Sequence, residues 1–280
     1  MSELARIPRR LGRVTNTALA IGLLLGVFVH ISGAYGATGA RLAGRFAMTG
    51  KITYARNVFG EHAGQGVRRN WTFYPQCPGS DCARVILWRQ RSGPRTLDRV
   101  VLDRVAPGLY RGRGRFWVRL RCSGRIDEHG GAALEAITVT VTRARTVGIT
   151  PFATAVKATY DNPARFNYTR CPGGIGRDAA RYSGPLASAL PQPPVTAFTQ
   201  AISALPTTVS FTDESRPQQG GAPLVSWRWD FGDPGSGAAN DSSSARDPVH
   251  AFSAHGTYTV TLTAKDAFGL ETTVAHAITV

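Results

Sequence analysis

Strict alternation of apolar and polar residues dominates the middle of this chain. Residues 115–122 send Phe116, Val118 and Leu120 to one face and place arginines and a tryptophan on the other. Residues 136–142 alternate with β-branched residues, which favour strands. Further strand candidates are residues 69–76, 83–89, 97–105 and 154–160. This region shows no 3.6-residue apolar period, so we expect antiparallel β structure, as a closed or nearly closed meander barrel or a sandwich.

A second strand pattern follows near the end of the chain. Tyr258, Val260 and Leu262 alternate with threonines after a turn at Gly256, and residues 274–280 supply a last strand. A motif precedes this pattern, made of Trp229, Asp230, Phe231, Gly232 and Asp233, and then of Pro248, His250 and Phe252.

This motif closely resembles the PKD (polycystic kidney disease) domain, an immunoglobulin-like β-sandwich. The family pattern has a Trp-Asp-Phe-Gly-Asp turn, a Pro-x-His-x-aromatic step and a Gly-x-Tyr-x-Val strand, all present here in that order. Pro234 stands where the family usually has glycine, which suggests a lengthened loop. The resemblance implies a surface protein or an accessory module of an exported hydrolase, with contacts to proteins or carbohydrates rather than catalysis.

The motif residues are interpreted as structural, with aromatic side chains filling the sandwich and an Asp-Gly turn. The alternative is a calcium site built from Asp230, Asp233 or Asp241, because carboxylate oxygens suit Ca²⁺. His250 is expected to be packed and hydrogen-bonded. No cysteine or glutamate stands at zinc-ligand spacing from it, so the sequence predicts neither a metal nor a cofactor.

The first 36 residues read as an export signal. Four arginines precede an apolar run at residues 18–31, and Ala34-Tyr35-Gly36 supplies a small-x-small cleavage pattern. The alternative is an uncleaved membrane anchor, since extension to residues 15–35 approaches the ~20 residues that span a bilayer. The protein is therefore expected to be extracellular, at the cell surface, or held in the plasma membrane by this segment.

Cysteine usage agrees with export, because an even number of cysteines follows the expected cut and none has CxxC spacing. Cys77 and Cys82 flank a tight Pro-Gly turn, which favours a local bridge and leaves Cys122 to pair with Cys171. Three connectivities are possible in principle. In the chain-entropy model the short loop contributes about 2 kcal/mol and the long one about 4 kcal/mol.

Charge divides the chain into two parts. The 280 residues carry a formal charge of +15. Residues 37–193 hold 25 basic and 9 acidic residues, whereas residues 194–280 hold 4 basic and 8 acidic residues. We expect a basic disulfide-bonded β-domain at residues 37–183, a Pro-rich linker at 184–193 and a PKD domain at 194–280. The basic domain also resembles an uncharacterised class of exported actinobacterial β-domains, through Trp71, Phe73, Pro75, Tyr110 and the four cysteines.

The arginines of the basic domain are its candidate binding residues. Arg115, Arg119 and Arg121 share one strand face with Trp117. Guanidinium groups suit phosphate and carboxylate, and an aromatic ring between them can stack on a sugar or base. Candidate partners are an anionic polysaccharide, a wall polymer or a surface protein, with nucleic acid less favoured. The alternative is a solvated strand neutralised in part by neighbouring acids.

Catalytic motifs are lacking, since the sequence has no nucleophile elbow, phosphate loop or dinucleotide fingerprint. The acid–base cluster Asp127-Glu128-His129 precedes Gly130-Gly131, which predicts a solvated hairpin loop. The sequence therefore favours a non-catalytic binding protein. The alternative is an accessory part of an exported polysaccharide- or protein-degrading enzyme.

Overall fold

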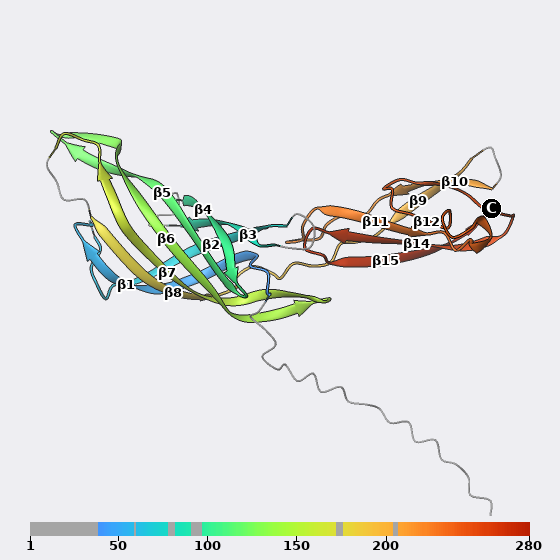
Figure 1. Ribbon diagram of the computed structural model, residues 1–280, viewed down its shortest axis with the longest axis horizontal. Coiled ribbons are helices and arrows are strands. Elements are labelled where there is room, and N and C mark those ends of the chain that lie inside the picture. Colours follow the sequence, from blue (N-terminus) through green and yellow to red (C-terminus); the bar gives the residue numbers. More distant parts are fainter. Residues whose placement is uncertain (1–38, 59, 78–81, 91–96, 172–175, 204–206) are drawn as a thin grey trace, which may run out of the picture. The chain divides into compact units, whose positions relative to one another are not determined.

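Figure 1 shows a computed structural model that describes residues 39–280 apart from residues 59, 78–81, 91–96, 172–175 and 204–206. The predicted export signal, residues 1–36, lies outside the described residues. Within the described part of the chain, none of the helical structure is long or apolar enough to traverse a bilayer. The fold is nearly all β, as the alternation predicts.

Eight strands form a closed barrel in which each strand is antiparallel to the next and β8 pairs with β1. The strands are β1 (Gly44–Arg56), β2 (Gly66–Gln76), β3 (Arg84–Gln90), β4 (Leu97–Ala106), β5 (Leu109–Cys122), β6 (Arg125–Val147), β7 (Thr150–Asn167) and β8 (Arg177–Pro185). The antiparallel β fold is therefore confirmed, and of the two architectures expected, a meander barrel or a sandwich, this part of the chain forms the barrel.

Alternation directs one set of side chains from every barrel strand inward. Large apolar residues fill much of the interior, among them Phe46, Met48, Trp71, Phe73 and Leu87. An eight-stranded barrel is just wide enough to be filled by side chains or to hold one small ligand. The barrel interior is therefore largely a packed core.

Residues 127–131 do not form the expected hairpin loop, because β6 begins at Arg125 and contains them. The turn lies earlier, at Ser123 and Gly124, which have φ values of 49° and 80°. Gly131 is required inside the strand, since a Cβ there would lie 2.6 Å from the carbonyl oxygen of Phe166. These glycines allow close strand packing instead of marking a turn.

The remaining strands form two facing sheets, as shown in orange and red in Figure 1. One sheet has the order β13-β10-β9 and the other β12-β11-β14-β15. Their bounds are β9 (Phe198–Ile202), β10 (Thr208–Asp213), β11 (Leu224–Asp230), β12 (Ser242–Ser243), β13 (Val249–Ala251), β14 (Thr257–Asp266) and β15 (Glu271–Thr279), with a 3-10 turn at Pro234–Ser236. Trp229, Phe231, Val260 and Leu262 are buried between the sheets, so an immunoglobulin-like sandwich forms as expected.

Both predicted disulfides are present. Cys77 bonds to Cys82, and Cys122 bonds to Cys171 at a sequence separation of 49 residues. The second bond ties the end of β5 to the segment that follows β7. Among the described residues no cysteine is free.

Candidate functional site

The four predicted binding residues lie at alternate positions of β5 and are all exposed. Arg115, Trp117, Arg119 and Arg121 face outward, while Phe116, Val118 and Leu120 between them are partly buried. The strand geometry therefore displays the arginines as the alternation predicts.

Trp117 is the centre of an aromatic cluster on this outer face. Its ring lies 4.9 Å from that of His129 and 6.2 Å from that of Tyr168. The guanidinium carbon of Arg115 is 4.8 Å from the centre of the Trp117 ring, and Arg115 Nη2 donates a hydrogen bond of 2.8 Å to Tyr168 Oη. Phe166 stacks on Tyr168 with parallel rings.

Strand register explains why these side chains meet. Trp117 of β5 pairs with Ala132 of β6, which pairs in turn with Phe166 of β7, so the small alanine separates two rings on one face. Trp117 is 48% exposed, Phe166 44% and Tyr168 54%. We call the set Arg115, Trp117, Arg119, Arg121, His129, Phe166 and Tyr168 the arginine–aromatic surface.

One arginine of this surface is neutralised in part. Arg119 Nη2 lies 2.7 Å from Glu128 Oε1, and both side chains are well exposed. Such a surface pair contributes little stability, about 0–1 kcal/mol, and exchanges readily for another anion. The solvated-strand alternative therefore applies to Arg119 more than to Arg115, whose guanidinium contacts aromatic rings.

Sequence reasoning missed three members of the surface. The sequence pattern predicts a loop at His129 and does not mark Phe166 or Tyr168. The sequence does hold a signal for Phe166 and Tyr168. The two aromatic residues lie two positions apart, so they share one face of an extended chain.

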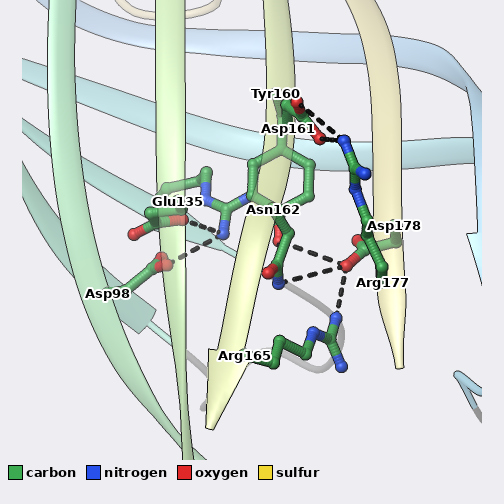
Figure 2. Close-up of polar contacts among 9 residues, drawn as sticks. Asp98, Glu135, Tyr160, Asp161, Asn162, Arg165, Arg177 and Asp178 are labelled. Atoms are coloured by element: carbon green, nitrogen blue, oxygen red, sulfur yellow. Dashed lines mark hydrogen bonds and ion pairs between the residues drawn. The ribbon is translucent and has the colours of Figure 1, made fainter. Parts of the chain in front are cut away.

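The barrel interior holds a second polar cluster that the sequence analysis did not identify (Figure 2). Arg89 is 3% exposed, and its Nη2 donates hydrogen bonds to Asp98 Oδ2 at 2.9 Å and Glu135 Oε2 at 2.5 Å. Its guanidinium carbon lies 4.2 Å from the centre of the Tyr160 ring. Gly114 leaves room for this cluster, since a Cβ there would lie 2.7 Å from Glu135 Oε1.

A neighbouring part of the cluster is centred on Asp178 of β8. Its Oδ1 accepts hydrogen bonds from Arg165 and from Asn162 Nδ2, the latter at 3.4 Å, and lies 3.4 Å from Tyr160 Oη, as Figure 2 shows. At the outer end of the same strand, Arg177 pairs with Asp161 at 3.4 Å.

A cavity of about 300 Å³ adjoins this cluster, and Trp117 and Arg119 of the arginine–aromatic surface contribute to its lining. Its lining combines apolar side chains with charged ones from several strands and from the β1–β2 loop, among them Ile52, Glu61, Arg69, Arg89, Ala180 and Tyr182. The cavity is at the small end of the range for ligand pockets, about 300–1,000 Å³.

Several ionisable side chains around the cavity have shifted pKa values. Burial opposes the charge of Arg89, but Glu135 and Asp98 outweigh this effect and raise its pKa above the usual value. Burial, followed by the charge of Asp178, raises the pKa of Glu61. Burial also raises the pKa values of Tyr160 and Tyr182, which keeps both hydroxyl groups protonated.

The motif of the sandwich domain forms a compact structural unit. Trp229 and Phe231 are buried, Trp229 Nε1 donates to the carbonyl of Ala245 at 2.9 Å, and Gly232 has the positive φ of 65° that the turn requires. His250 is buried and stacks on Phe231 with ring centres 4.2 Å apart. The predicted packing of His250 is therefore confirmed.

Asp233 connects the motif to the following strand. It accepts hydrogen bonds from Ser253 N at 2.8 Å, from Ser253 Oγ at 2.5 Å and at 3.1 Å from His250 Nε2. Burial disfavours its charge, but the hydrogen bonds from Ser253 and His250 outweigh burial and lower the pKa of Asp233. Among the described residues no group of three or more metal-ligating side chains is assembled.

Other motif residues stabilise the ends of strands. Asp230 is exposed and accepts from Gly232 N at 3.0 Å, while the carbonyl of Pro248 accepts from Phe211 N at 2.9 Å. Gly256 exchanges backbone hydrogen bonds with Val280, and Tyr258 Oη donates to the carbonyl of Ala254 at 2.9 Å.

Comparison with known proteins agrees with this geometry. Residues 191–280 match the PKD-domain family. This part of the chain is a PKD domain. Solved structures similar to it include the PKD1 domain of Vibrio anguillarum Epp, which is 32% identical, with a TM-score of 0.28 and coverage of 32% of this chain and 96% of that one. The PKD1 domain of the Vibrio cholerae metalloprotease PrtV is 29% identical, with a TM-score of 0.27 and coverage of 31% and 96%. No curated protein matches the chain.

Proposed function

We propose that this chain is a non-catalytic binding protein of the cell exterior and that its arginine–aromatic surface contacts an anionic polysaccharide. The observation that carries the proposal is the stack of Arg115 on Trp117, within a group of exposed aromatic rings. Solvent-exposed aromatic side chains grouped in this way on a strand face are typical of an interaction site.

The chemistry of the surface suits a charged carbohydrate. The guanidinium groups can donate paired hydrogen bonds to carboxylate, sulfate or phosphate groups. The rings of Trp117 and Tyr168 offer apolar faces to sugar rings, and Arg115 holds the two aromatic side chains together. A neutral polysaccharide would use the rings but would leave the arginines without anionic partners.

The charge of the whole basic region supports the same ligand class. With 25 basic and 9 acidic residues at positions 37–193, the field of this region attracts polyanions at long range. The disulfides and the PKD domain support a location outside the cytoplasm, where disulfides persist.

Polygalacturonate and dextran test the proposal as an anionic and a neutral polysaccharide. We expect the protein to be retained on immobilised polygalacturonate and not on dextran, and Trp117→Ala to elute earlier. Retention on both matrices would contradict the need for charge. Release of reducing ends from polygalacturonate would favour the enzyme-accessory alternative instead.

A further inference from the structure

The barrel cavity is a candidate for a second ligand site. Nε of Arg69, Nε of Arg89 and Oε2 of Glu61 line it or adjoin it, and each is buried without a hydrogen-bond partner among the described residues. Leaving a buried polar group unsatisfied costs about 1–3 kcal/mol, and more when the group is charged. Arg69, Arg89 and Glu61 therefore hold donors and an acceptor beside the cavity whose hydrogen-bonding capacity is unused among the described residues.

The charge balance indicates which ligand suits the cavity. Arg89 is paired with Asp98 and Glu135, and Arg165 is paired with Asp178. Arg69 makes no ion pair with a described residue, and Glu61 lines the same cavity. Arg119 also lines the cavity and pairs with Glu128, so four arginines meet five carboxyl groups, Glu61 included, and the surroundings carry little net charge. A negatively charged ligand would therefore gain little electrostatic free energy on binding. A positively charged ligand would be repelled by the guanidinium groups.

The apolar part of the lining supplies the remaining contacts. Ile52, Phe116, Ala180 and Tyr182 contribute hydrocarbon and ring surface beside the polar groups. Each hydroxyl group of a ligand can both donate and accept, so it can satisfy an arginine and a carboxyl group at once.

We propose that the cavity binds a small, uncharged, polyhydroxylated molecule of monosaccharide size. The charged side chains around the cavity are buried at a free-energy cost that a well-packed apolar core would avoid. The unsatisfied groups that carry the proposal belong to Arg69, Arg89 and Glu61, in the barrel and the β1–β2 loop, although Trp117 and Arg119 of the arginine–aromatic surface also line the cavity.

Ligand-observed NMR with the full chain tests this, using D-glucose, D-galactose and N-acetyl-D-glucosamine as probes and acetate as the charged comparator. We expect saturable binding of at least one sugar and none of acetate. Arg69→Leu is expected to weaken sugar binding by about tenfold or more, because it removes a buried donor. Arg68→Leu is the matched control, since Arg68 is the exposed neighbour on β2, and it should leave binding unchanged.

Ala180→Phe provides an independent test by filling the cavity, and its urea midpoint shows whether the barrel remains folded. If this variant unfolds, the pair of variants at positions 68 and 69 decides alone. Binding of acetate but no sugar, equal sugar binding by Arg69→Leu and wild type, or no saturable binding of any probe would overturn the proposal.

Discussion

Arg89 organises the polar half of the barrel interior. It lies on the inward face of β3 with Val85 and Leu87, opposite Asp98 on β4, and reaches Glu135 on β6. A buried charge costs several kcal/mol unless it is paired and hydrogen-bonded. The arginine is therefore tolerated because two carboxylates accompany it, and each carboxylate depends on the arginine in turn.

Arg89→Met tests this dependence. The substitution removes the buried guanidinium that both Asp98 and Glu135 accept from, so we expect the free energy of unfolding to fall by about 3–5 kcal/mol. Urea denaturation measures it. Arg84→Met is the matched control on the same strand, because it removes an exposed pair with Asp103 worth about 0–1 kcal/mol. Equal losses of unfolding free energy in the two variants would contradict the view that the buried cluster depends on the charge of Arg89.

Asp233 is expected to make the PKD domain sensitive to acid. Its folded pKa is lowered by Ser253 and His250 against the effect of burial. The unfolded chain therefore binds the proton more tightly, and stability is present above the unfolded pKa of about 3.9 and is lost as pH falls through the folded value. Asp233→Asn should expose the amides of β11 and β13 to faster hydrogen exchange at neutral pH. The difference from wild type should shrink on acidification below pH about 4; a difference that grows there would contradict this role.

At the scale of elements, the extended strands carry the candidate surface. β5, β6 and β7 have 14, 23 and 18 residues, whereas β3 has 7. The Cys122–Cys171 bond holds the far end of β5 against the chain that leaves β7. It therefore restrains the region that displays Arg121 and Tyr168.

Removal of this bond should destabilise the protein more than removal of the other. Replacing Cys122 and Cys171 by serine should lower the free energy of unfolding by about 4 kcal/mol, against about 2 kcal/mol for Cys77 and Cys82, because the longer loop gains more chain entropy when opened. Urea midpoints of the two double variants measure the difference. A larger loss from the Cys77 and Cys82 pair would contradict the loop-entropy account.

Much of the strand content could be predicted from alternation, and the PKD sandwich from its motif. β1 and β8 were missed, although Phe46, Met48 and Ile52 alternate in β1, because glycine and alanine weaken the pattern in both strands. The start of β6 was missed for a related reason. Its Gly130-Gly131 pair has the composition of a turn, yet the glycines serve close packing against β5 and β7.

The candidate surface was predictable in β5 but not across strands. Alternation places Arg115 and Trp117 on one face, whereas only the register joins them to Phe166. The buried cluster had a signal that was overlooked, because Arg89, Asp98 and Glu135 occupy inward positions of otherwise apolar faces. Which inward charges meet depends on barrel closure, which a single strand does not encode.

At the scale of the whole molecule, the two parts of the chain differ in charge. The basic region carries the arginine–aromatic surface, and residues 194–280 hold 8 acidic and 4 basic residues. A polyanion is therefore expected to bind the barrel and not the PKD domain. Since the attraction is between exposed charges, salt should weaken it as the Debye length falls from about 10 Å at 0.1 M to about 3 Å at 1 M.

The most direct test of the binding function is the dissociation constant for polygalacturonate at low salt, measured with Arg115, Arg119 and Arg121 all replaced by Gln. We predict binding at least about tenfold weaker than wild type, with an unchanged fold because these side chains point away from the core. Replacing the exposed arginines Arg68, Arg99 and Arg181 by Gln removes the same charge elsewhere on the barrel and should have a smaller effect. Equal weakening by the two triple variants would reduce the site to a general electrostatic effect, and equal binding by wild type and the first variant would contradict the proposed function.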